Sequence, residues 1–178
     1  MSRTNPYKKK RRSANRTLLV YGEGFCEEVF LKYLRGTYSY NSGIAVTIRN
    51  GKGGGAIEVV VSASKEPGDF GRRVVVLDND KSVQEMSKVR FEAKSRNIEL
   101  LENTPCLEAL LLAILRKGVS FSKKPPAWCK SEFESNYLDR HKRTEIEEYQ
   151  KVFPKDMLEK RRKDIPVLNQ LILIMEGK

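Results

Sequence analysis

The sequence has few of the residues that bind soft metal ions or form disulfides. It contains three cysteines, Cys26, Cys106 and Cys129, and a single histidine, His141, all far apart along the chain. This spacing does not match the paired ligands of a structural zinc site. Because the cysteines are odd in number and widely spaced, we expect reduced thiols and a cytoplasmic protein.

Long hydrophobic runs are also absent. The longest apolar stretches, residues 107–115 and 167–175, are too short to cross a membrane, and the basic N-terminus leads into no apolar signal-like segment. With 178 residues, of which 39% are hydrophobic, the chain is long enough to bury one core. We therefore expect one globular domain without membrane association.

The first 16 residues contain no acidic residue. Seven cationic residues lie in this segment, so the rest of the chain carries only +4 of the formal net charge of +11. Such a block attracts polyanions through counterion release, without sequence specificity, although a solubilising tail without a partner is the alternative. The cationic residues of this segment are Arg3, Lys8, Lys9, Lys10, Arg11, Arg12 and Arg16.

Up to Gly118, the hydrophobic pattern predicts alternating strands and helices. Short β-branched runs favour strands at residues 17–21, 44–48, 73–77 and 98–101. Helices are predicted after Glu27 with a stop at Gly36, over 82–97, and over 104–115 with Pro105 at the first helical position. Residues 56–64 have strand propensity, but a parallel sheet requires a crossover there, so we expect a helix.

The composition changes after residues 125–126. Charged amphipathic segments (128–139, 144–152 and 154–162) precede a final apolar helix over 167–175. The chain is therefore predicted to have three parts. These are a basic arm (1–16), an α/β domain (17–118) with a parallel sheet of about four strands flanked by helices, and a helical C-terminal extension (119–178) packed on the same domain.

Acidic residues follow two of the predicted strands. Glu23 lies in the turn after the first strand, and Asp78 and Asp80 end the third. Open α/β sheets bind ligands at the carboxyl ends of their strands, and in an extended D-x-D both side chains point to one side. Mg²⁺ or Mn²⁺ needs only one or two carboxylates besides water and phosphate. The pattern predicts a metal site that acts on phosphodiesters.

Three motifs together resemble the TOPRIM family of topoisomerases, primases and OLD-type nucleases. V-Y-G-E-G-F-C-E-E-V-F-L, residues 20–31, is similar to the nuclease form E-G-x-T-E-x-x-F-L, with Cys26 in the threonine position. V-V-V-L-D-N-D, residues 74–80, matches the D-x-D element. N-T-P-C-L-E, residues 103–108, resembles the S-N-P-C-F-E segment of RloB-like proteins, with Leu107 in place of an aromatic residue.

The resemblance implies a TOPRIM-like Rossmannoid fold and assigns roles to five acids. Glu23 corresponds to the family's glutamate, which acts as general acid/base or metal ligand, and Asp78 and Asp80 correspond to the metal-binding pair. Glu27 matches the second glutamate of the nuclease form, and Glu108 matches an acid that could reach the same cation. RloB-like proteins are associated with bacterial anti-phage systems.

Other residues have weaker signals. The glycine-rich segment 51–55 lacks the phosphate-loop pattern, so a flexible connection is the simpler interpretation, although Arg49 and Lys52 could contact phosphate. Lys81 could stabilise negative charge beside the D-x-D or be an ordinary solvated lysine. Cys26 has no nearby histidine to activate it as a nucleophile.

Two hypotheses follow. The first is a Mg²⁺- or Mn²⁺-dependent nuclease that cuts DNA or RNA as an effector of anti-phage defence, with Glu23, Asp78 and Asp80 as its essential residues. The second is a catalytically silent TOPRIM-like subunit that binds nucleic acid within a larger complex, for which an ATPase is a candidate partner. The oligomeric state is open in both.

Overall fold

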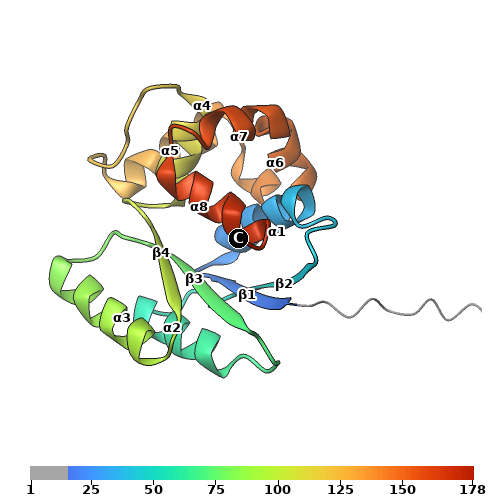
Figure 1. Cartoon of the computed structure of the whole chain (residues 1–178). Helices are drawn as coiled ribbons and strands as arrows, with labels where there is room; N and C mark the ends of the chain where they lie inside the picture. Colours follow the sequence, from blue (N-terminus) through green and yellow to red (C-terminus); the bar gives the residue numbers. More distant parts are fainter. Residues whose placement is uncertain (1–15) are drawn as a thin grey trace, which may run out of the picture.

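A four-stranded parallel sheet forms the centre of the molecule (Figure 1). The structure is a computed structural model that describes residues 16–178. The predicted nucleic-acid contacts of Lys8, Lys9, Lys10, Arg11 and Arg12 lie outside this range. The strands, in the spatial order β2-β1-β3-β4, are β1 (Arg16–Gly22), β2 (Ile44–Asn50), β3 (Arg72–Asp78) and β4 (Glu99–Asn103).

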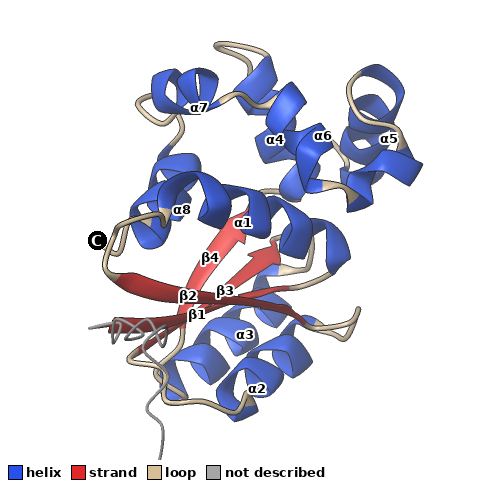
Figure 2. Ribbon diagram, turned by 90° about the vertical axis from the view of Figure 1, so that its right-hand side faces the viewer, coloured by secondary structure: helices blue, strands red, loops and turns tan. Residues whose placement is uncertain are grey.

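Helices cover both faces of this sheet (Figure 2). Helices α2 (Ala56–Lys65) and α3 (Val83–Ser95) lie on one face. Helices α1 (Phe25–Tyr38) and α8 (Pro166–Met175) lie on the other. Because both faces are buried, β1 and β3 consist of nearly continuous apolar residues rather than alternating ones. The predicted α/β class, with a flanked parallel sheet of four strands, is confirmed.

The crossover between β2 and β3 is the helix α2, as topology requires. Its β-branched residues Val59 and Val60 are buried against the sheet, which explains why strand-like residues occur in a helix. Ser82 caps α3, because its hydroxyl accepts the Glu85 amide hydrogen at 3.2 Å while the Glu85 carboxylate accepts the Ser82 amide hydrogen at 3.1 Å. Both helix predictions are confirmed.

Two helix boundaries were predicted wrongly. Helix α1 continues past Gly36 to Tyr38, because the Tyr38 ring is buried in the core and Gly36 lies on the exposed side. Helix α4 (Leu107–Leu115) begins after Cys106, which is its N-cap, so Pro105 is not the first helical residue. The backbone amide of Leu107, the first helical residue, donates a hydrogen bond to the Asp78 carboxylate of β3.

The C-terminal segments and α4 form a helical layer on the side of the sheet that α1 covers (Figure 1). Its aromatic side chains share one hydrophobic cluster with the sheet and α1, and the Tyr33 hydroxyl donates a hydrogen bond to the Phe153 carbonyl. No helix in the described range 16–178 combines the length and apolar character needed to span a bilayer. Besides α4, the layer consists of α5 (Pro126–Asn136), the 3-10 helix η1 (Arg140–Thr144), α6 (Ile146–Val152), α7 (Lys155–Arg161) and α8.

Candidate metal centre

The turns after β1 and β3 meet at the carboxyl end of the sheet. Glu23 follows β1 directly, and its carboxylate accepts a hydrogen bond from the Asp78 backbone amide at 3.0 Å. The backbone amide of Glu23 donates to the Val76 carbonyl at 3.1 Å. Glu23 and Asp78 are 55 residues apart in sequence, yet the structure brings them into contact, as the sequence predicted.

Helix α4 brings a further acid to Asp78. The Asp78 carboxylate accepts a hydrogen bond from the Leu107 backbone amide at 2.9 Å, which fixes the start of α4 above the end of β3. The possible ligand atoms of Asp78, Cys106 and Glu108 consequently lie within 4.8 Å of one another. Glu108, predicted from its motif to reach the same cation as Asp78, is therefore close enough to share one.

Glu27 lies next to this group on the first turn of α1. It is buried, and its carboxylate accepts the Gly24 amide hydrogen at 3.0 Å. A Cβ atom at Gly22 would lie only 2.8 Å from the Glu27 Cβ, so glycine at the end of β1 lets α1 approach closely. Burial, followed by the charges of Glu108 and Glu23, raises the pKa of Glu27.

The charges of these acids are poorly compensated within the protein. Burial raises the pKa of Asp78 to about 8, with further contributions from Glu27, Glu108 and Glu23. Buried carboxylates that crowd together hold protons unless a cation neutralises them. Hereafter we call Asp78, Glu108, Glu27 and Glu23 the acidic cluster.

Arg143, from η1, is the cation nearest to the acidic cluster. Its guanidinium forms ion pairs with one oxygen of Glu108 and with Glu134, and the side chain is only 8% exposed. The second oxygen of Glu108 is buried and has no hydrogen-bond partner within the described chain. Arg143 therefore neutralises only part of the cluster, and one carboxylate oxygen remains available for an ion. The sequence showed Arg143 only as one of several basic residues in a charged segment.

Asn103, at the end of β4, is a second residue that sequence reasoning missed. It is 1% exposed, and neither polar atom of its carboxamide has a partner among the described residues. Asn103 pairs in register with Asp78, so the two side chains project to the same face from neighbouring strands. The signal in the sequence was its position at the start of the N-T-P-C-L-E motif.

Buried oxygens without a partner in the described chain are candidate ligands of a divalent cation. A Mg²⁺ ion binds oxygen at about 2.0–2.1 Å, whereas a water molecule needs about 2.8 Å. Both Glu108 and Asn103 present an unpartnered oxygen that solvent does not reach. The donor set therefore fits a small, hard divalent cation.

Cys106 contributes a thiol to the same place. Burial raises its pKa, and the charges of Glu108 and Asp78 raise it further. A neutral thiol is a poor ligand for Mg²⁺, so the oxygens define the preference. Burial also raises the pKa of the Cys26 thiol despite the opposing charge of Arg143, which argues against Cys26 as a nucleophile.

The remaining predicted site residues form no hydrogen bond with the acidic cluster within residues 16–178. Strand β3 ends at Asp78, two residues before Asp80, and Asp80 is exposed and pairs with Lys81 at 2.9 Å. Arg49 pairs with Glu66 at 2.9 Å. Lys52 is exposed in the loop before α2.

No protein-family model matches the chain, and no curated protein or solved structure matches it. The resemblance to TOPRIM and RloB-like proteins thus stays a prediction from three motifs. The acidic cluster has to be interpreted from its own geometry.

Replacing Asn103 with leucine, which has a similar volume, tests the role of this carboxamide. We expect Asn103→Leu to stabilise the metal-free protein by about 1–3 kcal/mol, because an unpartnered buried polar group is removed. The stabilisation caused by Mn²⁺ should fall in the same variant. Chemical denaturation with and without Mn²⁺ measures both quantities, and a destabilised metal-free variant would show that Asn103 already has its partners inside the protein.

Proposed function

We propose that this protein is a divalent-metal-dependent nuclease that hydrolyses phosphodiester bonds of DNA or RNA. The observation that carries the proposal is the convergence of Asp78 and Glu108 at the carboxyl end of a parallel sheet, with one Glu108 oxygen buried and unpartnered. Carboxylates arranged in this way are suited to Mg²⁺ or Mn²⁺ that also contacts a phosphate.

In this proposal each acid has a different task. Asp78 and Glu108 would hold the cation, which when bound neutralises phosphate oxygens and the leaving oxygen. Glu23 fixes the backbone of Asp78 through its hydrogen bond and, being only half-buried, is the acid that could exchange a proton with substrate or water. Glu27 adds negative charge from α1, which strengthens cation binding.

Asp80 and Lys81 lie at the rim of the proposed site. Their ion pair is exposed, and the negative field of Glu23 raises the pKa of Lys81 after the larger effect of its hydrogen bond to Asp80. An incoming phosphate would compete with Asp80 for the ammonium group of Lys81. We therefore assign substrate contact to Lys81 and expect Asp80 to matter less for metal affinity than Asp78 does.

The test is cleavage of defined substrates by the purified protein. Single- and double-stranded DNA and RNA are incubated with Mg²⁺, Mn²⁺ or EDTA, and products are separated on denaturing gels. The proposal expects cleavage of at least one substrate with a metal ion and none with EDTA. Cleavage that persists in EDTA, or no cleavage of any substrate, contradicts it.

Metal binding should depend on pH because of Asp78. Its pKa in the folded protein, about 8, is above the usual 3.8, so the proton favours the folded state and this stability is lost as the pH rises through 8. From about pH 6 to about pH 9, the melting temperature without metal should therefore fall while the shift caused by Mg²⁺ grows. A shift that is constant across this range would show that metal binding does not require ionisation of Asp78.

A silent nucleic-acid-binding subunit is the second candidate, and Arg143 is the observation that favours it. A buried guanidinium already neutralises one oxygen of Glu108, and protonation of Asp78 would neutralise another acid. Under this alternative, the cluster is a structural remnant of a metal site. Calorimetry that detects no Mg²⁺ or Mn²⁺ binding, together with intact nucleic-acid binding by acid variants, would support it.

The biological setting is part of the same proposal. All three cysteines are free, and Cys106 and Cys129 are buried near one another without a disulfide, as suits a reducing cytoplasm. The motif resemblance points to anti-phage defence, with an ATPase as a candidate partner. Deleting the gene for this protein from the bacterium that carries it, and infecting the cells with phages, tests that setting. Loss of phage resistance is the expected result.

A further inference from the structure

Helix α5 presents the only tryptophan of the chain on the protein surface. Trp128 is 37% exposed, and its ring stacks on the buried Phe121 with 6.1 Å between centroids and 19° between ring planes. The ammonium group of Lys124 lies 5.0 Å from the centroid of the Trp128 ring. The Trp128 ring therefore packs against the Phe121 ring, and the Lys124 ammonium lies over the Trp128 ring.

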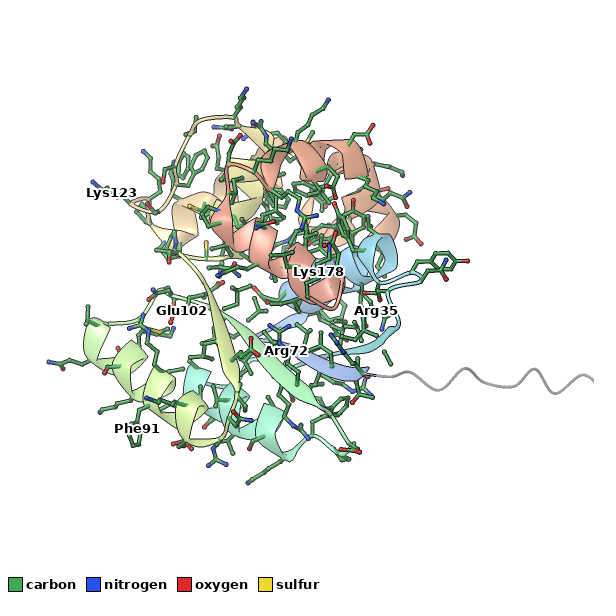
Figure 3. All side chains as sticks on the ribbon, viewed as in Figure 1. Arg35, Arg72, Phe91, Glu102, Lys123 and Lys178 are labelled. Carbon is green, nitrogen blue, oxygen red and sulfur yellow. The ribbon has the colours of Figure 1, made fainter. Side chains whose placement is uncertain are left out.

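Three exposed lysines lie in the same segment as this ring, residues 123–130. Lys123, Lys124 and Lys130 are exposed, and none of them forms a salt bridge within residues 16–178. The two carboxylates on the same helix are already occupied, because Glu132 pairs with Arg116 and Glu134 pairs with Arg143. Lys123 projects outward from the connection between α4 and α5 (Figure 3). The surface therefore carries positive charge that the protein does not compensate.

Helix α5 also contacts the part of the chain that carries the acidic cluster. Cys129, between Trp128 and Lys130, turns inward, is fully buried, and interacts with the side chain of Cys106. Partial burial lowers the pKa of Lys130, but the charges of Glu108 and Asp78 outweigh it and raise the pKa overall. Lys130 thus lies within electrostatic reach of Glu108 and Asp78.

We propose that Trp128, Lys123, Lys124 and Lys130 form a binding platform for single-stranded nucleic acid. A base would displace the flexible Lys124 side chain from the ring face and stack on Trp128, and the lysines would contact the neighbouring phosphates. Bases in a duplex already stack on one another and offer no free face, so single strands are the preferred ligand. The choice of nucleic acid as ligand rests on the proposed function, but binding to the platform requires neither metal nor cleavage.

The single tryptophan makes the platform directly observable. The full chain, in EDTA, is titrated with a thymidine oligonucleotide of about 12 nucleotides while the fluorescence of Trp128 is recorded. Stacking of a base on the indole should quench this fluorescence in a saturable way. A duplex of the same length should bind without comparable quenching.

Charge reversal separates the platform from the other basic residues. Lys123→Glu combined with Lys124→Glu should weaken binding about tenfold and make the salt dependence shallower by about 0.7 per lost phosphate contact. The matched control, Lys88→Glu combined with Lys94→Glu, changes the same charge at exposed lysines of α3, on the opposite face of the sheet. This control should bind within about twofold of wild type, a difference too small to indicate a lost phosphate contact.

Three results would overturn the proposal. They are the absence of quenching while a labelled oligonucleotide binds, equal losses of affinity in both charge-reversal pairs, and equal quenching by duplex. The outcome is independent of the nuclease proposal, because quenching without any cleavage would keep the platform and reject the nuclease. Cleavage without quenching would do the reverse.

Discussion

Asp78→Asn is expected to abolish metal-dependent cleavage and metal binding while leaving the fold intact. Asparagine keeps an oxygen that can accept the Leu107 amide hydrogen, now at 2.9 Å, but it removes the charge that a cation needs. Loss of the bound ion should lower the cleavage rate by about a thousandfold, which corresponds to roughly 4 kcal/mol of transition-state stabilisation. Rates in Mn²⁺ and melting temperatures with and without Mn²⁺ measure the two effects.

The metal-free variant supplies its own internal control. At about pH 4, close to the usual carboxyl pKa of 3.8, keeping the proton on Asp78 costs the folded wild type little, so Asp78→Asn should melt near the wild-type temperature. At about pH 9 it should melt higher, because the variant avoids repulsion from Glu27, Glu108 and Glu23. Asp80→Asn is the matched variant outside the cluster, and equal loss of metal affinity in both variants would contradict the assignment of Asp78 as the central ligand.

Arg143→Ala is expected to destabilise the protein by about 3–5 kcal/mol, because it leaves the buried Glu108 without its cation and also removes the partner of the partly exposed Glu134. If a metal ion and Arg143 share the charge of Glu108, Mn²⁺ should recover part of this loss. The stabilisation by Mn²⁺ should then be larger in Arg143→Ala than in the wild type. Urea unfolding at several Mn²⁺ concentrations measures both terms.

Arg49→Ala is the control for this experiment. Arg49 also forms an ion pair at 2.9 Å, with Glu66, but its side chain is 54% exposed, and surface pairs contribute only about 0–1 kcal/mol. This variant should remain close to wild type with and without Mn²⁺. If Arg143→Ala is strongly destabilised but responds to Mn²⁺ no more than the wild type does, Arg143 and the ion do not share Glu108.

The fold could be predicted from the sequence where topology was decisive. Residues 56–64 contain β-branched residues that favour a strand, yet a parallel sheet needs a crossover at that point, and α2 is a helix. Glu23 and Asp78 were predicted to converge because the carboxyl ends of parallel strands meet at one edge. The end of α1 was missed because burial of Tyr38 outweighs the weak helix-breaking effect of Gly36.

The composition of the site could not be predicted in the same way. Arg143 reaches Glu108 from a segment 35 residues away, and no local pattern in a charged helical region identifies which arginine turns inward. The register of β4 places Asn103 beside Asp78, and the start of α4 places Cys106 there. A shift of either element by one residue would move that side chain away from Asp78. Asp80 follows the end of β3 by two residues and pairs with Lys81, so its part in the predicted metal pair stays a prediction.

The position of a bound ion tests the central claim most directly. Crystals soaked in Mn²⁺ should show one anomalous difference peak between Asp78 and Glu108, with carboxylate oxygens at about 2.1 Å, a distance typical of small divalent cations. Arg143 should keep its ion pair with Glu134, whether or not it moves away from Glu108. The absence of a Mn²⁺ peak at the acidic cluster, with Arg143 still paired to Glu108, would contradict the account. So would a fully occupied Mn²⁺ peak elsewhere on the protein in place of that one.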